Sequence, residues 1–175
     1  MKEIIGVDLD GTLLNIAEAE MKLLSNYNIY DYPTDWGFKD YPYEVRQLLY
    51  KMFKTPEIMC DLDPFPGVTN KVNEWKSKGY DLIVITARDK EIEQETKKFV
   101  WELFQLPCIV LNSHDKKQAF LDTGINCWID DNPENVIIAK NMGILSILIS
   151  NITTPYNWHV RNKVNWVEAL TDIKL

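Results

Sequence analysis

The sequence predicts an α/β protein in which helices cover both faces of a parallel β-sheet. Short apolar runs alternate with longer amphipathic segments along most of the chain, which is the order expected of strand–helix–strand units. The run 80–86 (YDLIVIT) is apolar along nearly its whole length, as in a strand buried on both faces. Gly79 and Gly143 follow predicted helices, at the left-handed position that glycine favours.

The alternation assigns each element in turn. The predicted strands, in chain order, are residues 3–8, 80–86, 108–111, 127–130 and 145–149. The predicted helices are residues 68–78, 90–106, 116–122, 134–142 and 166–173. Pro107 ends the second of these helices, because proline cannot continue a helix.

The segment 15–65 breaks this alternation and predicts a small helical cap. Two apolar faces repeat at helical spacing, and the loop 30–43 between them is rich in aromatic residues, including Trp36 and Phe38. Because the segment directly follows the first strand, we expect it over that strand's carboxyl end, where open α/β sheets bind ligands. The predicted organisation is a core of residues 1–14 and 66–175 with a cap of residues 15–65. The apolar faces consist of Leu14, Ala17, Met21 and Leu24, and of Val45, Leu48, Leu49 and Met52.

The composition limits the class of partner. Hydrophobic residues make up 46% of the 175 residues and charged residues 26%, as in soluble folded domains. The sequence contains no apolar run of membrane-spanning length and no signal peptide pattern, so we predict a cytoplasmic protein without a membrane partner. The net charge of −7 disfavours a nucleic-acid backbone as ligand but not a small anion. The three cysteines lack CxxC spacing and are expected to be buried thiols.

Acidic and polar side chains follow three of the predicted strands. Asp8 and Asp10 come at the end of the first strand, Thr86 ends the second, and Asp130 and Asp131 end the fourth. Parallel strands deliver such side chains to the same edge of a sheet. Several carboxylates cannot share a low-dielectric pocket as bare anions, so either their pKa values rise or a cation lies among them. Carboxylate oxygens suit Mg²⁺, and the sequence therefore predicts Mg²⁺ at this edge.

With Mg²⁺ present, each of these side chains fits a role in phosphoryl transfer. Asp8 can attack phosphorus as the nucleophile. Asp10 can protonate the leaving oxygen and then deprotonate water. Thr86 offers a hydroxyl donor, and Lys116 offers positive charge to the phosphoryl oxygens. Lys117 is the alternative to Lys116.

These motifs resemble the four motifs of the haloacid dehalogenase (HAD) superfamily phosphatases, in the same order. The run 7–13 (VDLDGTL) resembles the first motif and 85–88 (ITAR) the second. Lys116 resembles the third motif, and 129–131 (IDD) resembles the fourth. The four motifs bracket almost the whole chain.

The resemblance implies a Rossmann-like core with a helical cap after the first motif. It implies that Asp8 is the nucleophile and Asp10 the acid/base, and that Mg²⁺ is held by Asp8, the backbone carbonyl of Asp10, and Asp130 or Asp131. It also places Thr86, Ala87 and Lys116 at the substrate phosphate.

A narrower resemblance is to the 5′(3′)-deoxyribonucleotidase group. In that group aromatic cap residues stack on the base, and Trp36 and Phe38 occupy the corresponding region here. The resemblance also implies a homodimer. The supporting stretches are 65–67 (FPG), 86–88 (TAR), 130–135 (DDNPEN), 155–157 (PYN), and Arg161, Val164 and 166–168 (WVE).

The motifs together predict a Mg²⁺-dependent phosphomonoester hydrolase acting through an aspartyl-phosphate, with (deoxy)nucleoside monophosphates as substrates. One alternative is a phosphatase for another small metabolite or for a nucleic-acid 3′-phosphate. A remote alternative is a receiver-like signalling module that holds a phosphoryl group. For Arg88 three roles are open: capping the next helix, pairing with Asp89 or Glu91 at the surface, or contacting the substrate phosphate.

Overall fold

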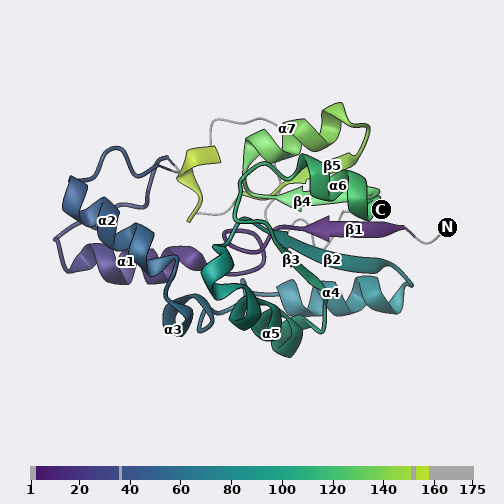
Figure 1. The fold of residues 1–175 in the computed structure, drawn as a ribbon, viewed down its shortest axis with the longest axis horizontal. Helices are drawn as coiled ribbons and strands as arrows, with labels where there is room; N and C mark the ends of the chain where they lie inside the picture. Colours follow the sequence, from purple (N-terminus) through teal and green to yellow (C-terminus); the bar gives the residue numbers. More distant parts are fainter. Residues whose placement is uncertain (1–2, 36, 151–152, 158–175) are drawn as a thin grey trace.

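The computed structural model describes residues 3–35, 37–150 and 153–157 and has the expected Rossmann-like α/β architecture (Figure 1). Its five strands form one sheet in the order β3-β2-β1-β4-β5, and every neighbouring pair is parallel. The predicted strands are present, shorter by one residue at several ends. They are β1 (Ile4–Val7), β2 (Asp81–Thr86), β3 (Cys108–Val110), β4 (Cys127–Asp130) and β5 (Leu145–Leu148).

Helices cover both faces of the sheet, with α4 and α5 on one side and α6 and α7 on the other (Figure 1). The helix predicted over residues 90–106 is divided, because a 3₁₀ turn, η1 (Lys90–Ile92), precedes α5 (Glu93–Phe104). The remaining three helices are α4 (Val68–Ser77), α6 (Lys117–Thr123) and α7 (Pro133–Asn141). The helix predicted over residues 166–173 lies outside the described residues.

The strand order creates a crevice beside the central strand, β1. The chain passes from β1 through β2 to β3 on one side of the sheet, and then crosses to β4 and β5 on the other side. Such a reversal opens a ligand site at the carboxyl ends of the two strands that flank it, here β1 and β4. Val7 pairs with Ile129 in register, so the residues that follow them, Asp8 and Asp130, come out of the sheet side by side.

A glycine in β1 allows a large aromatic ring to lie against this strand. A Cβ atom at Gly6 would lie only 2.8 Å from Cε3 of Trp128. Trp128 is fully buried on β4, and its ring lies 4.7 Å from that of Phe120 on α6. The packing of Trp128 thus links α6 and β4 to β1 just below the strand ends that carry the acidic residues.

Three helices between β1 and α4 lie beyond the carboxyl ends of the strands (Figure 1). They are α1 (Ile16–Ser25), α2 (Tyr43–Met52) and the short α3 (Pro56–Met59), which the periodicity did not predict. The two chain segments that connect them to the sheet run together: the Asn15 N–H donates to Asp63 O at 2.9 Å, and the Phe65 N–H donates to Leu13 O at 3.0 Å. In the part of the chain that the structure describes, no helix is both long enough and apolar enough to cross a bilayer.

Glu20 is a buried carboxyl group on α1, with 8% of its surface exposed. Among the described residues nothing donates a hydrogen bond to it or forms an ion pair with it. Burial raises the pKa of Glu20 from 4.5 to about 8, and the nearby charge of Asp10 adds to the rise. The folded protein therefore keeps a proton on Glu20 that the unfolded chain releases near pH 4.5.

This difference predicts a pH-dependent effect of Glu20→Gln on stability. The parent should lose stability as the pH rises from about 4.5 to about 8, because only its unfolded state releases the proton in this window. The stability gained by Glu20→Gln should therefore grow with pH and reach a few kcal/mol, since one pKa unit corresponds to about 1.4 kcal/mol. Urea unfolding at pH 5 and pH 8 measures this. Glu18→Gln, at an exposed position of the same helix, is the control, and a gain independent of pH would contradict the prediction.

Candidate active site

A cavity of about 410 Å³ lies at the carboxyl ends of the strands. Its floor consists of residues from the strand ends, and its outer wall includes residues from α2 and the loop before it. The lining residues include Asp8, Asp10, Phe38, Tyr50, Phe53, Lys54, Thr86, Ala87, Arg88, Asn112, Ser113, His114, Lys116, Asp130 and Asp131.

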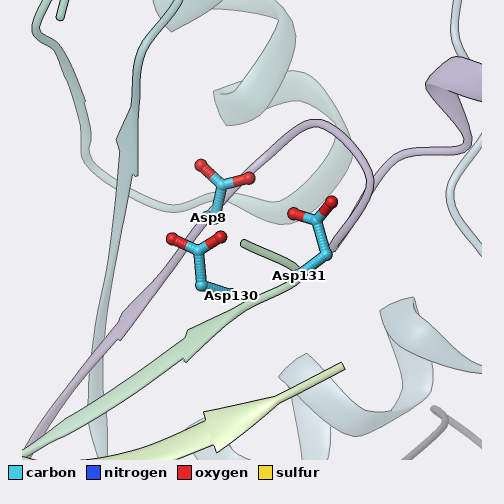
Figure 2. Close-up of side chains that lie close together, drawn as sticks. All are labelled: Asp8, Asp130 and Asp131. Atoms are coloured by element: carbon cyan, nitrogen blue, oxygen red, sulfur yellow. The ribbon is translucent and has the colours of Figure 1, made fainter. Parts of the chain in front are cut away.

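Figure 2 shows the carboxylates of Asp8, Asp130 and Asp131 facing a common space. One oxygen from each lies within 4.8 Å of the other two, and all three residues are buried. Asp8 directly follows β1, and Asp130 is the last residue of β4. The structure therefore brings together three of the four aspartates predicted at the metal site.

Lys116 brings a positive charge to the same place. Its ammonium group contacts Asp8 Oδ1 and lies 3.1 Å from Asp130 Oδ2. It also lies 4.7 Å above the ring of Trp128. Burial alone would lower the pKa of Lys116, but Asp130 and Asp8 raise it above its ordinary value, so the side chain stays charged. Its neighbour Lys117 is exposed, and the structure places Lys116 rather than Lys117 in the cavity.

The cluster has more negative than positive charge. Three carboxylates and one ammonium group would leave two negative charges uncompensated. Burial, opposed by Lys116, raises the pKa of Asp8 to about 7, and burial together with Asp130 raises the pKa of Asp131 well above its usual range. A divalent cation would remove this penalty, and three carboxylate oxygens are a donor set suited to Mg²⁺. The residues present therefore fit Mg²⁺.

Hydrogen bonds fix Asp130 in its orientation. Trp128 Nε1 donates to Asp130 Oδ2 at 3.1 Å, and Asn135 Nδ2 donates to the same oxygen at 2.9 Å. The backbone N–H of Asn132 donates to Oδ1 at 2.7 Å. Together with Lys116 these donors use most of the lone pairs of Asp130, so fewer are left for a metal ion.

Asp131 is held by fewer donors. The Thr12 hydroxyl donates to Oδ1 at 2.9 Å, and the Tyr156 hydroxyl donates to Oδ2. Asn157 Nδ2 donates to the backbone carbonyl of Asp131 at 2.7 Å. Each carboxylate oxygen of Asp131 keeps a free lone pair. Asp131 is therefore better placed than Asp130 to bind a cation. Tyr156 and Asn157 follow Asp131 by 25 and 26 residues, and their place in the tail motif was the sole sequence signal for them.

Asp10 is held apart from the other aspartates by Arg88. Arg88 Nε donates to Asp10 Oδ2 at 2.8 Å, and Arg88 Nη2 donates to Oδ1 at 2.7 Å. This pairing was not among the roles expected for Arg88, and the surface pair with Asp89 or Glu91 is wrong. Lys54 makes that pair instead, at 2.9 Å from Asp89 and 3.4 Å from Glu91.

The other predicted substrate residues divide into three cases. Thr86 and Ala87 line the cavity at the end of β2, where the Thr86 hydroxyl accepts a hydrogen bond from the Arg88 N–H at 3.3 Å. Phe38 also lines the cavity but is 5% exposed, because it packs on Tyr41 and Phe53. Trp36 lies outside the described residues.

The sheet, the acidic strand ends and the helices above them have the arrangement expected of a HAD superfamily phosphatase. Within that class, residues 2–174 match the model of the family described as 5′ nucleotidase, deoxy (Pyrimidine), cytosolic type C protein. The chain belongs to this family, and the protein is a phosphatase of the nucleotidase type.

Individual relatives are distant. A Chlorobaculum tepidum protein, provisionally described as a 5′(3′)-deoxyribonucleotidase, is 23% identical over 98% of this chain and 90% of its own length. A Clostridium acetobutylicum structure, described as a predicted phosphatase, has a TM-score of 0.62 at 18% identity, covering 97% of this chain and 96% of the other. CbbY from Rhodobacter sphaeroides, in complex with xylulose-1,5-bisphosphate, has a TM-score of 0.57 at 14% identity, covering 94% and 93%. At these identities the two structures support the fold alone.

Gly11 offers a test of the acidic cluster. Its φ is +82°, and a Cβ atom there would overlap Oδ2 of Asp131. Gly11→Ala should therefore displace Asp131 and abolish the thermal stabilisation by Mg²⁺ that binding to the folded state produces.

Gly143→Ala is the matched control. Gly143 also has a positive φ, +78°, but nothing lies within 4 Å of its Cβ position, so this variant shares the backbone strain of roughly 1–2 kcal/mol without the overlap. Thermal unfolding with and without Mg²⁺ compares the two. Equal Mg²⁺ stabilisation in both variants would contradict the role given to the space beside Gly11.

Proposed function

We propose that this protein removes the phosphate group from (deoxy)nucleoside monophosphates, with Mg²⁺ as cofactor and Asp8 as the nucleophile. One observation carries the proposal: the Asp8 carboxylate lines the cavity in contact with the Lys116 ammonium group, and one of its oxygens lies within 4.8 Å of oxygens of Asp130 and Asp131. The family match supports the nucleotide substrate.

We assign the metal ligands from the available donors. Asp8 and Asp131 would bind Mg²⁺ through their side chains, and Asp10 would bind it through its backbone carbonyl. Asp130, with its four donors, would orient Lys116 and support the site. When bound, Mg²⁺ neutralises charge on the carboxylates and on the phosphoryl oxygens.

In the first step an oxygen of Asp8 attacks phosphorus and forms an acyl-phosphate bond as the bond from phosphorus to the ester oxygen breaks. Asp10 gives its proton to the departing oxygen, so the nucleoside leaves as an alcohol. The Lys116 ammonium group and the Thr86 hydroxyl donate to the phosphoryl oxygens, whose charge is spread in the transition state.

In the second step water attacks the phosphorus of the phospho-aspartate. Asp10, now a carboxylate, takes the proton from this water, and the bond between phosphorus and Asp8 breaks. Inorganic phosphate leaves, Asp8 is restored as a carboxylate, and Asp10 again holds its proton. The two steps balance without any further reactant.

Aromatic side chains on the cap side of the cavity fit a nucleobase. Phe38, Tyr50 and Phe53 all line the cavity. Tyr50 is 42% exposed, whereas Phe38 is 5% exposed, so Tyr50 offers the larger free ring surface. Its hydroxyl donates to Gly37 O at 3.1 Å, which restrains the ring. We therefore assign base stacking first to Tyr50, and we expect Phe38 to support the Tyr50 ring by packing beside it.

Asp8→Asn should abolish turnover, because an amide is a far weaker nucleophile than a carboxylate. The assay is release of inorganic phosphate from a panel of nucleoside monophosphates, sugar phosphates and an oligonucleotide 3′-phosphate, each with Mg²⁺ and after treatment with EDTA. We expect the highest kcat/KM on a nucleotide and no turnover in EDTA.

Several results of this panel would change the account. Activity of Asp8→Asn within tenfold of the parent would remove Asp8 as nucleophile. A higher kcat/KM on sugar phosphates would replace the nucleotide with another small metabolite. Turnover that persists in EDTA would remove Mg²⁺ from the proposal.

Tyr50→Ala should raise KM for a nucleoside monophosphate about tenfold or more, since stacking on one base contributes roughly 1–3 kcal/mol. KM for ribose 5-phosphate, which has no base, should stay unchanged. Tyr43→Ala is the control, because Tyr43 lies on the same helix with 63% of its surface exposed and does not line the cavity. An equal rise in KM for both substrates would argue against stacking on Tyr50.

The cytoplasmic location and the homodimer stay predictions, as does the division into a core and a cap at residues 15–65.

A further inference from the structure

Arg88 forms an ion pair whose burial has no evident structural purpose. Its side chain is 1% exposed, and that of Asp10 is 19% exposed. Burial opposes the charge on Arg88, but Asp10 holds the pKa of the guanidinium group above its ordinary value. Buried ion pairs are often no more stabilising than apolar residues of similar size. The pair therefore points to a role beyond stability.

The contact between Arg88 and Asp10 is bidentate. Nε and Nη2 of Arg88 each donate to a different oxygen of Asp10, at 2.8 and 2.7 Å. A planar guanidinium group bound in this way fixes the plane of the carboxyl group as well as its position. Nη1 of Arg88 lies 3.5 Å from the hydroxyl of Thr96 on α5, so the arginine also contacts this helix. Both Asp10 and Arg88 line the cavity.

We propose that Arg88 is the positioning residue for the acid/base Asp10. This inference rests on the proposed function. The observed pair suits Asp10 as a carboxylate, the state that forms when Asp10 has given its proton to the leaving oxygen, and Arg88 stabilises that state. Arg88 also fixes the plane of the carboxyl group at the edge of the cavity when the group carries the proton. The same two hydrogen bonds from Arg88 keep the Asp10 carboxylate in place to take a proton from water in the second step. Asp10 thus gives one proton to the alcohol in the first step and takes another from water in the second.

A substrate whose leaving group needs no proton can distinguish a role of Arg88 in positioning Asp10 from a purely structural role. Loss of a nucleoside requires a proton on the departing oxygen, whereas p-nitrophenolate departs without one. The ratio kcat/KM covers the steps up to departure of the leaving group, so the second step does not enter it. Damage confined to the positioning of Asp10 should therefore affect a nucleotide and spare p-nitrophenyl phosphate.

The experiment compares kcat/KM of Arg88→Met and Arg88→Lys on the best nucleotide and on p-nitrophenyl phosphate. We expect a loss of about 10²–10³-fold on the nucleotide, within the range of general acid–base catalysis, and less than about tenfold on p-nitrophenyl phosphate. The lysine variant should lose activity in the same selective way, because one ammonium group cannot hold both oxygens of Asp10. Arg46→Met is the control, since Arg46 lies on α2 against Tyr43; it should leave both ratios unchanged.

Combination with Asp10→Asn supplies the second measurement. If Arg88 acts through Asp10, Arg88→Met should reduce nucleotide turnover by less than about threefold in the Asp10→Asn background. Equal losses on both substrates, no loss on the nucleotide, or full additivity with Asp10→Asn would overturn the proposal.

If Arg88→Met fails to fold, Arg88→Lys carries the same comparison. If the parent hydrolyses p-nitrophenyl phosphate but no nucleotide, the nucleotide assignment fails, and glycerol phosphate then serves as the ester that needs a proton.

Discussion

The mutual repulsion of buried carboxylates is the constraint on which the rest of this site depends. The reversal of strand order beside β1 brings Asp8 and Asp130 out of the sheet as neighbours, and Asp131 follows at once. Lys116 compensates one of the three negative charges. Burial and the remaining negative charge raise the pKa values of Asp8 and Asp131, and a cation bound among these carboxylates would offset that charge.

The surroundings of the cluster restrain two of the carboxylates through donors of their own. Asp130 is fixed by Trp128, Asn132 and Asn135, and Asp131 by Thr12 and Tyr156. This separation matters because side chains held by their own donors cannot rotate away from one another when the cation is absent. The site is therefore preorganised, which is the condition under which electrostatic stabilisation of a transition state is most effective. The segment between β1 and α4 lines the other side of the cavity with the aromatic residues Phe38, Tyr50 and Phe53.

Much of this could be predicted from sequence because the chemistry coincides with strand ends. The apolar runs before Asp8, Thr86 and Asp130 fixed both the sheet and its acidic edge, and motif order supplied the superfamily. Features that depend on distant partners could not be predicted. Arg88 and Asp10 are 78 residues apart, and no local pattern links them. The choice of Lys116 over Lys117 needed the position at which α6 begins.

The most direct test of the shared cation site is a crystal structure of the protein with Mn²⁺ in place of Mg²⁺, read by anomalous scattering. We expect one strong peak within coordination distance of an Asp8 oxygen, the Asp10 backbone carbonyl and an Asp131 oxygen. Absence of a peak among these three groups, at a Mn²⁺ concentration that supports turnover, would contradict this expectation.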